Sequence, residues 1–545
     1  MKGKRILSLT AAVLAGIMLL SACGGSGSVS NETKSGVPVS KVNEFPIVSE
    51  PITLSIFREK SASVEDVTTN AFTKWYEEKT NVKIDWNLIS GDVRQAINLQ
   101  IASDDYSDIF MGFGFARSEQ VAYYDQGIYI DMSDLVEEHG YYIKEMFKND
   151  PNIEKKLRHT DNKLFGLPTY VEEFAGDAPY KMWVYEPWMK KLNAKKPETT
   201  EEFYELLKRF KTEDPNGNGK LDEIPLAARD SRGGQIGLDM YLMNSFVTWS
   251  KYGFYNDNGK AVFAPITDEA REGIRYMNKL YKEGLIHPDS FIMDRARVTA
   301  IAENDVPILG AAPAKWTTQF TVAGAASNRM NEYVAIPPLE GPGGVKQSLY
   351  GQTDPGCTWF SITTACENPA AAVKWIDWFY SEEGYLKTKA TDGMRLAKEG
   401  EIGLDGEQAK YALDPVEGAT VGDAIQNERW LSLAIGYWPR ENGINFKDNT
   451  IDATRQQKAY DAFKLYDPYV LKDVTIGDFP VPSNISEEYL ELRSSITSAI
   501  DSGFVSFVIG EKDIETEWDA YVENFYNLGL ERYTEIIQDY IDTLK

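Results

Sequence analysis

The sequence predicts an α/β protein of more than one domain, with a largely parallel sheet near its start. Three apolar, β-rich segments at 52–57, 82–89 and 108–112 are separated by segments with helical spacing of apolar residues at 65–79 and 93–102. This alternation is typical of a parallel sheet covered by helices. A length of 545 residues is too great for one domain of ordinary size.

A second α/β unit begins near residue 181. Residues 181–185 form a predicted strand, and residues 187–192 a short helix. We expect Thr200 to cap a helix over 201–211, since Glu lies in its first turn and Lys and Arg in its last.

The rest of the chain continues the mixed pattern. Thr267 is expected to cap a helix that runs through Lys282, and the last ~115 residues read as mostly helical. The other expected elements are a strand at 306–309, a strand at 358–364 and a helix at 369–380.

Composition narrows the function classes. The chain has 57 Lys and Arg against 83 Asp and Glu, a formal net charge of −26, which disfavours nucleic acid and anionic membrane surfaces as partners. A hydrophobic fraction of 43% disfavours a disordered chain. Only three His are present, far apart in sequence, which gives little material for a zinc site or a His-based triad.

The N-terminus reads as a secretory signal. Three basic residues precede an apolar run over residues 6–20, and Cys23 follows small residues. This pattern resembles the bacterial lipobox, which implies lipidation of Cys23 after removal of residues 1–22. Residues 23–49 are expected to be a flexible tether, and the lipid the only membrane contact. Cys357 and Cys366 flank a predicted strand, too far apart for a disulfide.

The loop after residue 213 has the residue types of a calcium site. Oxygen-bearing side chains alternate along it, Gly219 allows a sharp bend, and two carboxylates follow. This is the ligand logic of an EF-hand loop, although its twelfth position is Pro225 and not Glu. The bland alternative is a solvated turn. The predicted ligands of a structural Ca²⁺ are Asp214, Asn216, Asn218, Asp222, Glu223 and the carbonyl of Lys220.

Motifs along nearly the whole mature chain resemble those of one family. They are Cys23 and the segments 101–109, 165–168, 214–225, 362–378 and 509–522. With them the chain resembles bacterial extracellular solute-binding proteins of ABC importers, in the carbohydrate-binding group. It looks most like the long lipoproteins of Bacillota and like alginate-oligosaccharide binding proteins, whose similar loop holds calcium.

The resemblance implies a periplasmic-binding-protein-like clamshell of type II. Its first lobe would hold residues 50–170 and 336–400, and its second lobe residues 171–335 and 401–545, with crossings near Tyr170 and Ile336. It also implies a monomer on the outer face of the cell membrane, which captures a carbohydrate by lobe closure and presents it to ABC importer permease subunits. No covalent chemistry is implied.

A sugar site needs aromatic rings for stacking and planar, multi-donor polar groups. Each candidate also has a plain alternative, core packing for a ring and a surface position for a charge. Several Arg in the cleft would favour an acidic oligosaccharide. The expected ligand residues are Arg58 and Arg117 at strand ends, Tyr170 and Glu172 at the crossover, Trp316, Trp438 and Arg440, with Trp249 and Trp359 as weaker candidates.

Two other functions remain open at this point. The many carboxylates provide material for a surface polysaccharide-degrading enzyme with an acid/base pair. A sensor that hands its liganded form to a membrane kinase would have the same fold as an importer receptor.

Overall fold

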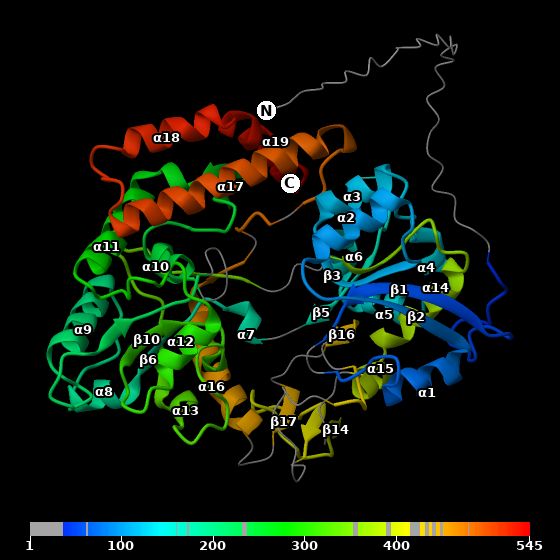
Figure 1. The fold of residues 1–545 in the computed structure, drawn as a ribbon, viewed down its shortest axis with the longest axis horizontal. Coiled ribbons are helices and arrows are strands. Elements are labelled where there is room, and N and C mark those ends of the chain that lie inside the picture. The colour runs from blue at the N-terminus through cyan, green and yellow to red at the C-terminus, as the bar shows by residue number, and fades with distance from the viewer. Residues whose placement is uncertain are drawn as a thin grey trace, which may run out of the picture.

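A computed structural model describes residues 36–544, with gaps at 62–63, 160, 172–173, 231–236, 352–357, 389–393, 415–425, 431–434, 439–442, 447–450, 473 and 478. Two α/β lobes stand side by side, and each surrounds its own sheet (Figure 1).

The first lobe is built on a five-stranded sheet of order β2-β1-β3-β13-β4. Strand β1 is parallel to both β2 and β3, which confirms the predicted parallel unit, and β13 is antiparallel to β3. The elements of this lobe are β1 (Ile52–Glu59), α1 (Ala71–Thr80), β2 (Val82–Ile89), α2 (Val93–Ser103), β3 (Ile109–Phe115), α3 (Arg117–Asp125), α4 (Ser133–His139), α5 (Tyr142–Asn149), α6 (Pro151–Leu157), β4 (Leu167–Pro168), β13 (Thr358–Ile362), α14 (Pro369–Asp377) and α15 (Glu382–Thr388).

The second lobe is built on a four-stranded sheet of order β11-β6-β10-β7. Strand β6 runs antiparallel to both neighbours, and only β10 and β7 are parallel. Its elements are α7 (Phe174–Asp177), β6 (Met182–Tyr185), α8 (Glu186–Lys191), α9 (Thr200–Thr212), β7 (Ile224–Leu226), α10 (Leu238–Leu242), β8 (Phe254–Asp257), β9 (Lys260–Phe263), α11 (Asp268–Lys282), α12 (Arg295–Ala302), β10 (Leu309–Pro313), α13 (Arg329–Glu332), β11 (Tyr333–Ile336), β12 (Ser348–Leu349), α16 (Ile451–Tyr466), β18 (Val470–Leu471), α17 (Ser486–Ile509), α18 (Trp518–Asn527) and α19 (Leu530–Thr543).

Four smaller sheets are present in the described residues, two of which are the pairs β8-β9 and β12-β18. Strand β5 (Tyr170–Val171) pairs in parallel with β16 (Tyr437–Trp438) between the lobes. Strands β14 (Met394–Leu396), β15 (Tyr411–Leu413) and β17 (Ile444–Phe446) form a three-stranded sheet.

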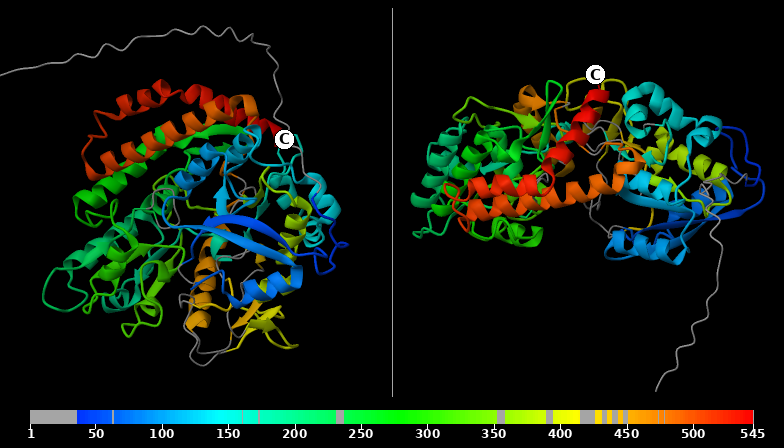
Figure 2. Two further views of the ribbon diagram at one scale, coloured as in Figure 1. Left: turned by 45° about the vertical axis from the view of Figure 1, so that its right-hand side comes forward. Right: turned by 90° about the horizontal axis from the view of Figure 1, so that it is seen from above.

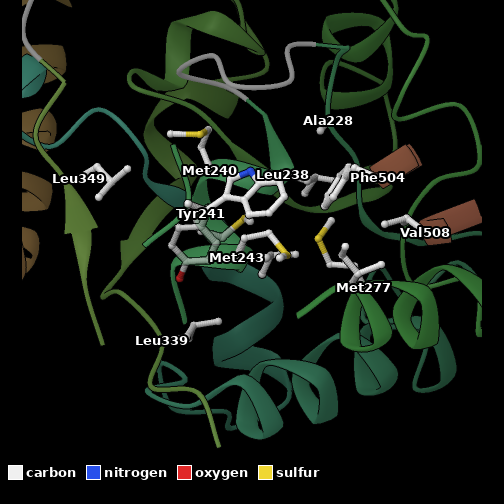
Figure 3. Close-up of a cluster of buried hydrophobic side chains, with 14 of the residues drawn as sticks. Ala228, Leu238, Met240, Tyr241, Met243, Met277, Leu339, Leu349, Phe504 and Val508 are labelled. Atoms are coloured by element: carbon white, nitrogen blue, oxygen red, sulfur yellow. The ribbon is translucent and has the colours of Figure 1, made fainter. Parts of the chain in front are cut away.

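The core of the second lobe draws on distant parts of the chain. Figure 3 shows Met240, Tyr241 and Met243 from the α10 region packed near Met277 of α11 and Phe504 of α17. Burial of these large side chains stabilises the lobe by about 25 cal/mol for each Å² of apolar surface removed from water. The C-terminal helices are therefore part of the second lobe.

The crossings between lobes differ from the expected boundaries. At Tyr170 the chain does pass from β4 in the first sheet to α7 beside the second lobe. Ile336, however, pairs with Met182 inside the second sheet, and Leu349 lies in the second core. The crossing at 336 is corrected to one after residue 349, because the backbone of β11 is already paired with β6. Trp430 packs into the first core, so part of 401–545 belongs with the first lobe.

The expected tether also ends earlier than residue 49. Ile47 and Val48 are fully buried in the first core. The backbone N–H of Val37 donates to Asn368 Oδ1 at 3.0 Å, and Lys374 Nζ donates to the carbonyl of Ser40 at 2.8 Å. Residues 36–49 are therefore a fixed part of the first lobe.

One helix cap also differs from the prediction. Thr199, not Thr200, caps α9, because its hydroxyl accepts from the backbone N–H of Glu202 at 3.1 Å. Thr267 caps α11 as predicted, with its hydroxyl accepting from the N–H of Ala270.

The two lobes also contact each other away from the chain crossings. Helix α3 of the first lobe contacts the start of α17 and the short turn Ser483–Ile485 that precedes it. Figure 2 shows α17 extending from the second lobe toward the first.

Candidate functional site

A cavity of about 610 Å³ lies between the two lobes on the side where α3 meets the start of α17. Its first-lobe wall comes from the start of α3 and from α6 with the two residues that follow it. Its second-lobe wall comes from the segment after β18 and from α19. The described lining residues are Arg117, Asn152, Lys155, Lys156, Arg158, His159, Asn256, Thr475, Ile476, Gly477, Phe479, Pro480, Val481, Pro482, Ile485, Ile536, Asp539, Tyr540, Ile541, Thr543 and Leu544.

Arg117 stands at the carboxyl end of β3, where the chain turns into α3. In open parallel sheets, ligands bind beyond the carboxyl ends of the strands. The Arg117 side chain is only 4% exposed, yet it lines the cavity. A buried guanidinium at a strand end can bind planar oxygen groups with two hydrogen bonds.

His159 is a lining residue that the sequence reasoning missed. Its Nε2 lies 3.2 Å from Gln120 Oε1, and the Gln120 amide nitrogen donates to the Phe115 carbonyl at 2.8 Å. This arrangement places the proton on Nε2 and leaves Nδ1 as an acceptor. Burial, reinforced by the nearby charge of Arg117, lowers the pKa of His159 to about 4, so the ring is neutral at pH 7.

The opposite wall carries an aromatic pair. The rings of Phe479 and Tyr540 stack with centroids 4.2 Å apart and an interplanar angle of 8°. Ile476, Val481 and Ile536 extend this apolar surface. The cavity therefore has one polar, basic wall and one aromatic and aliphatic wall.

The crossover brings two predicted site segments together. Pairing of β5 with β16 sets the backbone of Tyr170 beside that of Tyr437, and the backbone of Val171 beside that of Trp438. These segments are more than 260 residues apart in sequence. Glu172 and Arg440, also predicted as ligand contacts, lie outside the described residues.

Trp316 lies shortly after β10, an inner strand of the second sheet, and is half-buried. Its ring centroid lies 6.3 Å from that of Phe174, and the Arg455 guanidinium lies 5.3 Å from its ring. Phe174 also contacts Tyr460 and Phe463 of α16. An aromatic group thus sits where the chain leaves the first lobe.

Three other candidates lie outside the cavity. Arg58 is buried at the end of β1, where burial lowers its pKa to about 9. Trp249 packs in the second core and donates from Nε1 to Asp239 Oδ2 at 3.3 Å, so its role is structural. Trp359 packs against the first core.

The loop predicted to hold calcium folds around the carboxylate of Asp214. Asp214 Oδ1 accepts from the N–H groups of Gly217 and Asn218 at 2.9 and 3.1 Å, and Oδ2 accepts from Gly219 at 3.0 Å. The side-chain amides of Asn216 and Asn218 both donate to Asp222 at 3.0 Å. The alternating side chains therefore do converge inside one turn.

Glu223 is the last of the predicted ligand residues in this loop. Its Oε1 accepts from the N–H of Asn216 at 3.2 Å, while its Oε2 is buried without a hydrogen-bond partner among the described residues. Burial, with Asp214 and Asp222 nearby, raises the pKa of Glu223. An orphaned carboxylate oxygen beside two further carboxylates fits the oxygen shell of a hard cation. No cluster of three or more acidic, His or Cys side chains is preformed for a metal in the described part of the chain.

Two remaining sequence predictions concern cysteines and the membrane. Cys366 is buried in the first core, while Cys23 and Cys357 lie outside the described residues. None of the helices in residues 36–544, gaps excepted, is long and apolar enough to cross a membrane.

Comparison with known proteins extends this description. The chain is 22% identical over 569 residues to the fructooligosaccharide ABC transporter substrate-binding protein FusA of Streptococcus pneumoniae, which covers 99% of each chain. It is 35% identical over 117 residues to the lipoprotein LipO of Bacillus subtilis, over 21% of this chain and 23% of LipO.

Solved structures share the fold. The structure of an EF-hand mutant of S. pneumoniae FusA in complex with fructo-nystose matches with a TM-score of 0.74 and 20% identity, over 90% of this chain and 99% of that one. The alginate-binding protein AlgQ2, in a structure without calcium ion, matches with a TM-score of 0.68 and 21% identity, over 91% and 99%.

The periplasmic-binding-protein-like α/β fold predicted from the sequence is thereby confirmed. The bacterial extracellular solute-binding protein family matches residues 61–385, which is more than half of the chain. The chain therefore belongs to the bacterial extracellular solute-binding proteins.

Proposed function

We propose that this protein captures an oligosaccharide between its two lobes outside the cell and delivers it to the permease of an ABC importer. The observation that carries the proposal is the cavity whose walls come from both lobes, because a ligand held by both walls couples binding to lobe closure. The aromatic group around Trp316 and Phe174 adds flat apolar faces of the kind that sugars stack on.

Membership of the solute-binding family makes the protein a transport component and not an enzyme. FusA, similar along the whole chain, is named for fructooligosaccharide transport, which supports a carbohydrate ligand here. A role in sensing would use the same fold, and the import proposal rests on this relative.

A thermal-shift screen over neutral and acidic oligosaccharides tests the proposal. A true ligand is expected to raise the melting temperature in a concentration-dependent way. Small-angle scattering on the same sample is expected to show a smaller radius of gyration with ligand, since closure brings the lobes together. Hydrolysis products in the mixture, or binding of peptides but no saccharide, would contradict the proposal.

We further propose that the loop from Asp214 to Glu223 holds a structural Ca²⁺. The donors would be the side chains of Asp214, Asn216, Asn218, Asp222 and Glu223 with the Lys220 carbonyl. A cation there would replace the amide N–H donors that now offset the charge of Asp222 and would give the orphaned Glu223 Oε2 a partner. The similar structures named for an EF-hand mutant and for a protein without calcium ion support this reading.

Lipid anchoring at Cys23 is the third part of the proposal. The basic start, apolar run and small residues before Cys23 support it, as does the partial similarity to the lipoprotein LipO. Mass spectrometry of the membrane fraction is expected to show a diacylated N-terminal peptide, and Cys23→Ser is expected to release the protein into the medium.

A further inference from the structure

The charge balance of the interlobe cavity is the reverse of that of the whole chain. The chain carries 83 acidic against 57 basic residues. Among the described residues that line the cavity, four are Arg or Lys and one, Asp539, is acidic. Cations gathered in a partly enclosed cleft focus the local field and attract anions.

Two of these cations have no counter-charge. The ammonium groups of Lys155 and Lys156, both on the last turn of α6, make no ion pair and no hydrogen bond within the described residues. Several lysines elsewhere in this lobe do pair, as Lys144 does with Glu137 and Lys148 with Glu145. The basic wall thus has two ammonium groups that no described residue pairs with.

Arg158 presents a further donor beside them. Its Nε donates to Glu154 at 2.8 Å and its Nη1 to the Asn162 carbonyl at 2.9 Å, which fixes the guanidinium plane. Its Nη2 makes no hydrogen bond to a described residue. A positioned guanidinium with a spare donor suits a carboxylate oxygen.

His159 adds a requirement of a different kind. Its Nδ1 is buried, lines the cavity and lacks a hydrogen-bond partner among the described residues. With the proton on Nε2, this nitrogen needs a donor, and a sugar hydroxyl is one. The facing Tyr540 ring, half-buried and stacked on the buried ring of Phe479, offers an apolar surface to the C–H face of a sugar ring.

From this combination we propose that the transported oligosaccharide is acidic, and that a carboxylate-bearing sugar occupies the interlobe cavity. Its carboxylate pairs with Lys155, Lys156 and Arg158, a hydroxyl donates to His159 Nδ1, and its ring packs on Tyr540. This inference rests on the proposed carbohydrate-binding function and names the charge class of the ligand. A neutral oligosaccharide would leave the basic wall without a partner.

Matched ligands separate charge from shape. The mature chain is titrated calorimetrically with oligogalacturonates of three to six units, with the same oligomers after methyl esterification, and with fructo-oligosaccharides. Esterification removes the negative charge and keeps the rings and hydroxyls. We expect the free acids to bind at least about tenfold more tightly than the esters at low salt, and the difference to shrink as salt screens the charges.

Matched variants locate the site. Lys155→Gln with Lys156→Gln is expected to weaken binding of the acids by about five- to tenfold and to leave binding of the esters unchanged. The control Lys144→Gln with Lys148→Gln removes the same charge from neighbouring α5, away from the cavity, and is expected to leave both affinities unchanged.

The outcomes are distinguishable. Equal or tighter binding of esters or fructo-oligosaccharides overturns the acidic ligand and leaves the carbohydrate receptor standing. Equal loss in the two double variants overturns the assigned cavity, because it would reflect net charge alone. Binding of no saccharide overturns the proposed function together with this inference.

Discussion

Arg58 lies against the backbone of Gly112, so closely that a Cβ atom built on Gly112 would stand 2.8 Å from Arg58 Nη2. Gly112 has φ of +90°, a conformation that residues with a side chain rarely adopt. The missing side chain in β3 therefore makes the space in which β1 buries a guanidinium at its end.

Gly112→Ala should destabilise the first lobe through both the positive φ and the contact with Arg58. The control is Gly91→Ala, which has φ of +110° and nothing within 4 Å of its Cβ. We expect chemical denaturation to show a loss of about 1 kcal/mol for Gly91→Ala and about 2–3 kcal/mol for Gly112→Ala. Equal losses would mean that Arg58 moves aside at little cost.

Calcium is expected to stabilise the second lobe. At a concentration 100-fold above its Kd, Ca²⁺ would add about 2.7 kcal/mol, or roughly 5–10 °C in Tm relative to EDTA. Glu223→Gln should abolish this shift, whereas Lys220→Gln should keep it because Lys220 would contribute its carbonyl. If EDTA leaves the Tm of the wild type unchanged, the proposal that this loop binds calcium is wrong.

The calcium shift should also depend on pH. The pKa of Glu223 is raised by burial and by its carboxylate neighbours, so the calcium-free folded state takes up a proton more readily than the unfolded chain. That stabilisation is present at low pH and is lost as pH rises through the folded pKa. Calcium should therefore raise Tm more at pH 7 than at pH 4.

His159 should make the first lobe acid-sensitive. Its folded pKa of about 4 lies below the ordinary 6.5, so between these values the unfolded chain binds more protons and stability falls as pH falls. The loss amounts to at most about 3 kcal/mol. Among the charged groups near His159, Arg117 and Lys163 lower its pKa, and Asp161 and Asp131 raise it.

Denaturation midpoints from pH 7.5 to pH 4 test this. His159→Gln should flatten the acid slope relative to the wild type. The matched control His139→Gln should change it less, since that side chain is half-buried. Identical slopes for wild type and His159→Gln would contradict a buried neutral imidazole.

Trp316 and Trp249 should separate binding from stability. Trp316→Ala is expected to weaken ligand binding at least about tenfold, because a half-exposed ring at the crossover is available for stacking. Trp249→Phe should lower Tm and leave affinity unchanged, because that ring is in the second core. If calorimetry instead shows weaker binding for Trp249→Phe and unchanged binding for Trp316→Ala, the binding role assigned to Trp316 is wrong.

Local patterns predicted the first sheet well. The segments that form β1, β2 and β3 have alternating or continuous apolar residues, and the two helices between them have clear apolar faces. The local sequence is therefore sufficient to predict these elements. The loop at Asp214 was equally readable, since its ligand-type side chains are close in sequence.

Long-range pairing was not readable in the same way. Ala335 and Ile336 precede two prolines and look like a hinge, yet they pair with β6 about 150 residues earlier. Residues 36–49 are fixed by partners that are distant in sequence, among them Asn368, Lys374 and the carbonyl of Thr80. His159 could not be predicted as a site residue from the sequence, because its hydrogen-bond partner Gln120 and the nearby charge of Arg117 are about 40 residues away and meet it only in the fold.

Gly36, the first described residue, packs against the backbone of Glu367 and Asn368 in the first lobe. With Cys23 anchored in the membrane as proposed, the intervening residues reach at most about 45 Å when fully extended. The first lobe would then be tethered close to the bilayer, and the second lobe would move relative to it during opening and closure. The ligand-bound receptor would then meet the permease within a thin layer at the membrane, where the short tether keeps the effective concentration of the receptor high.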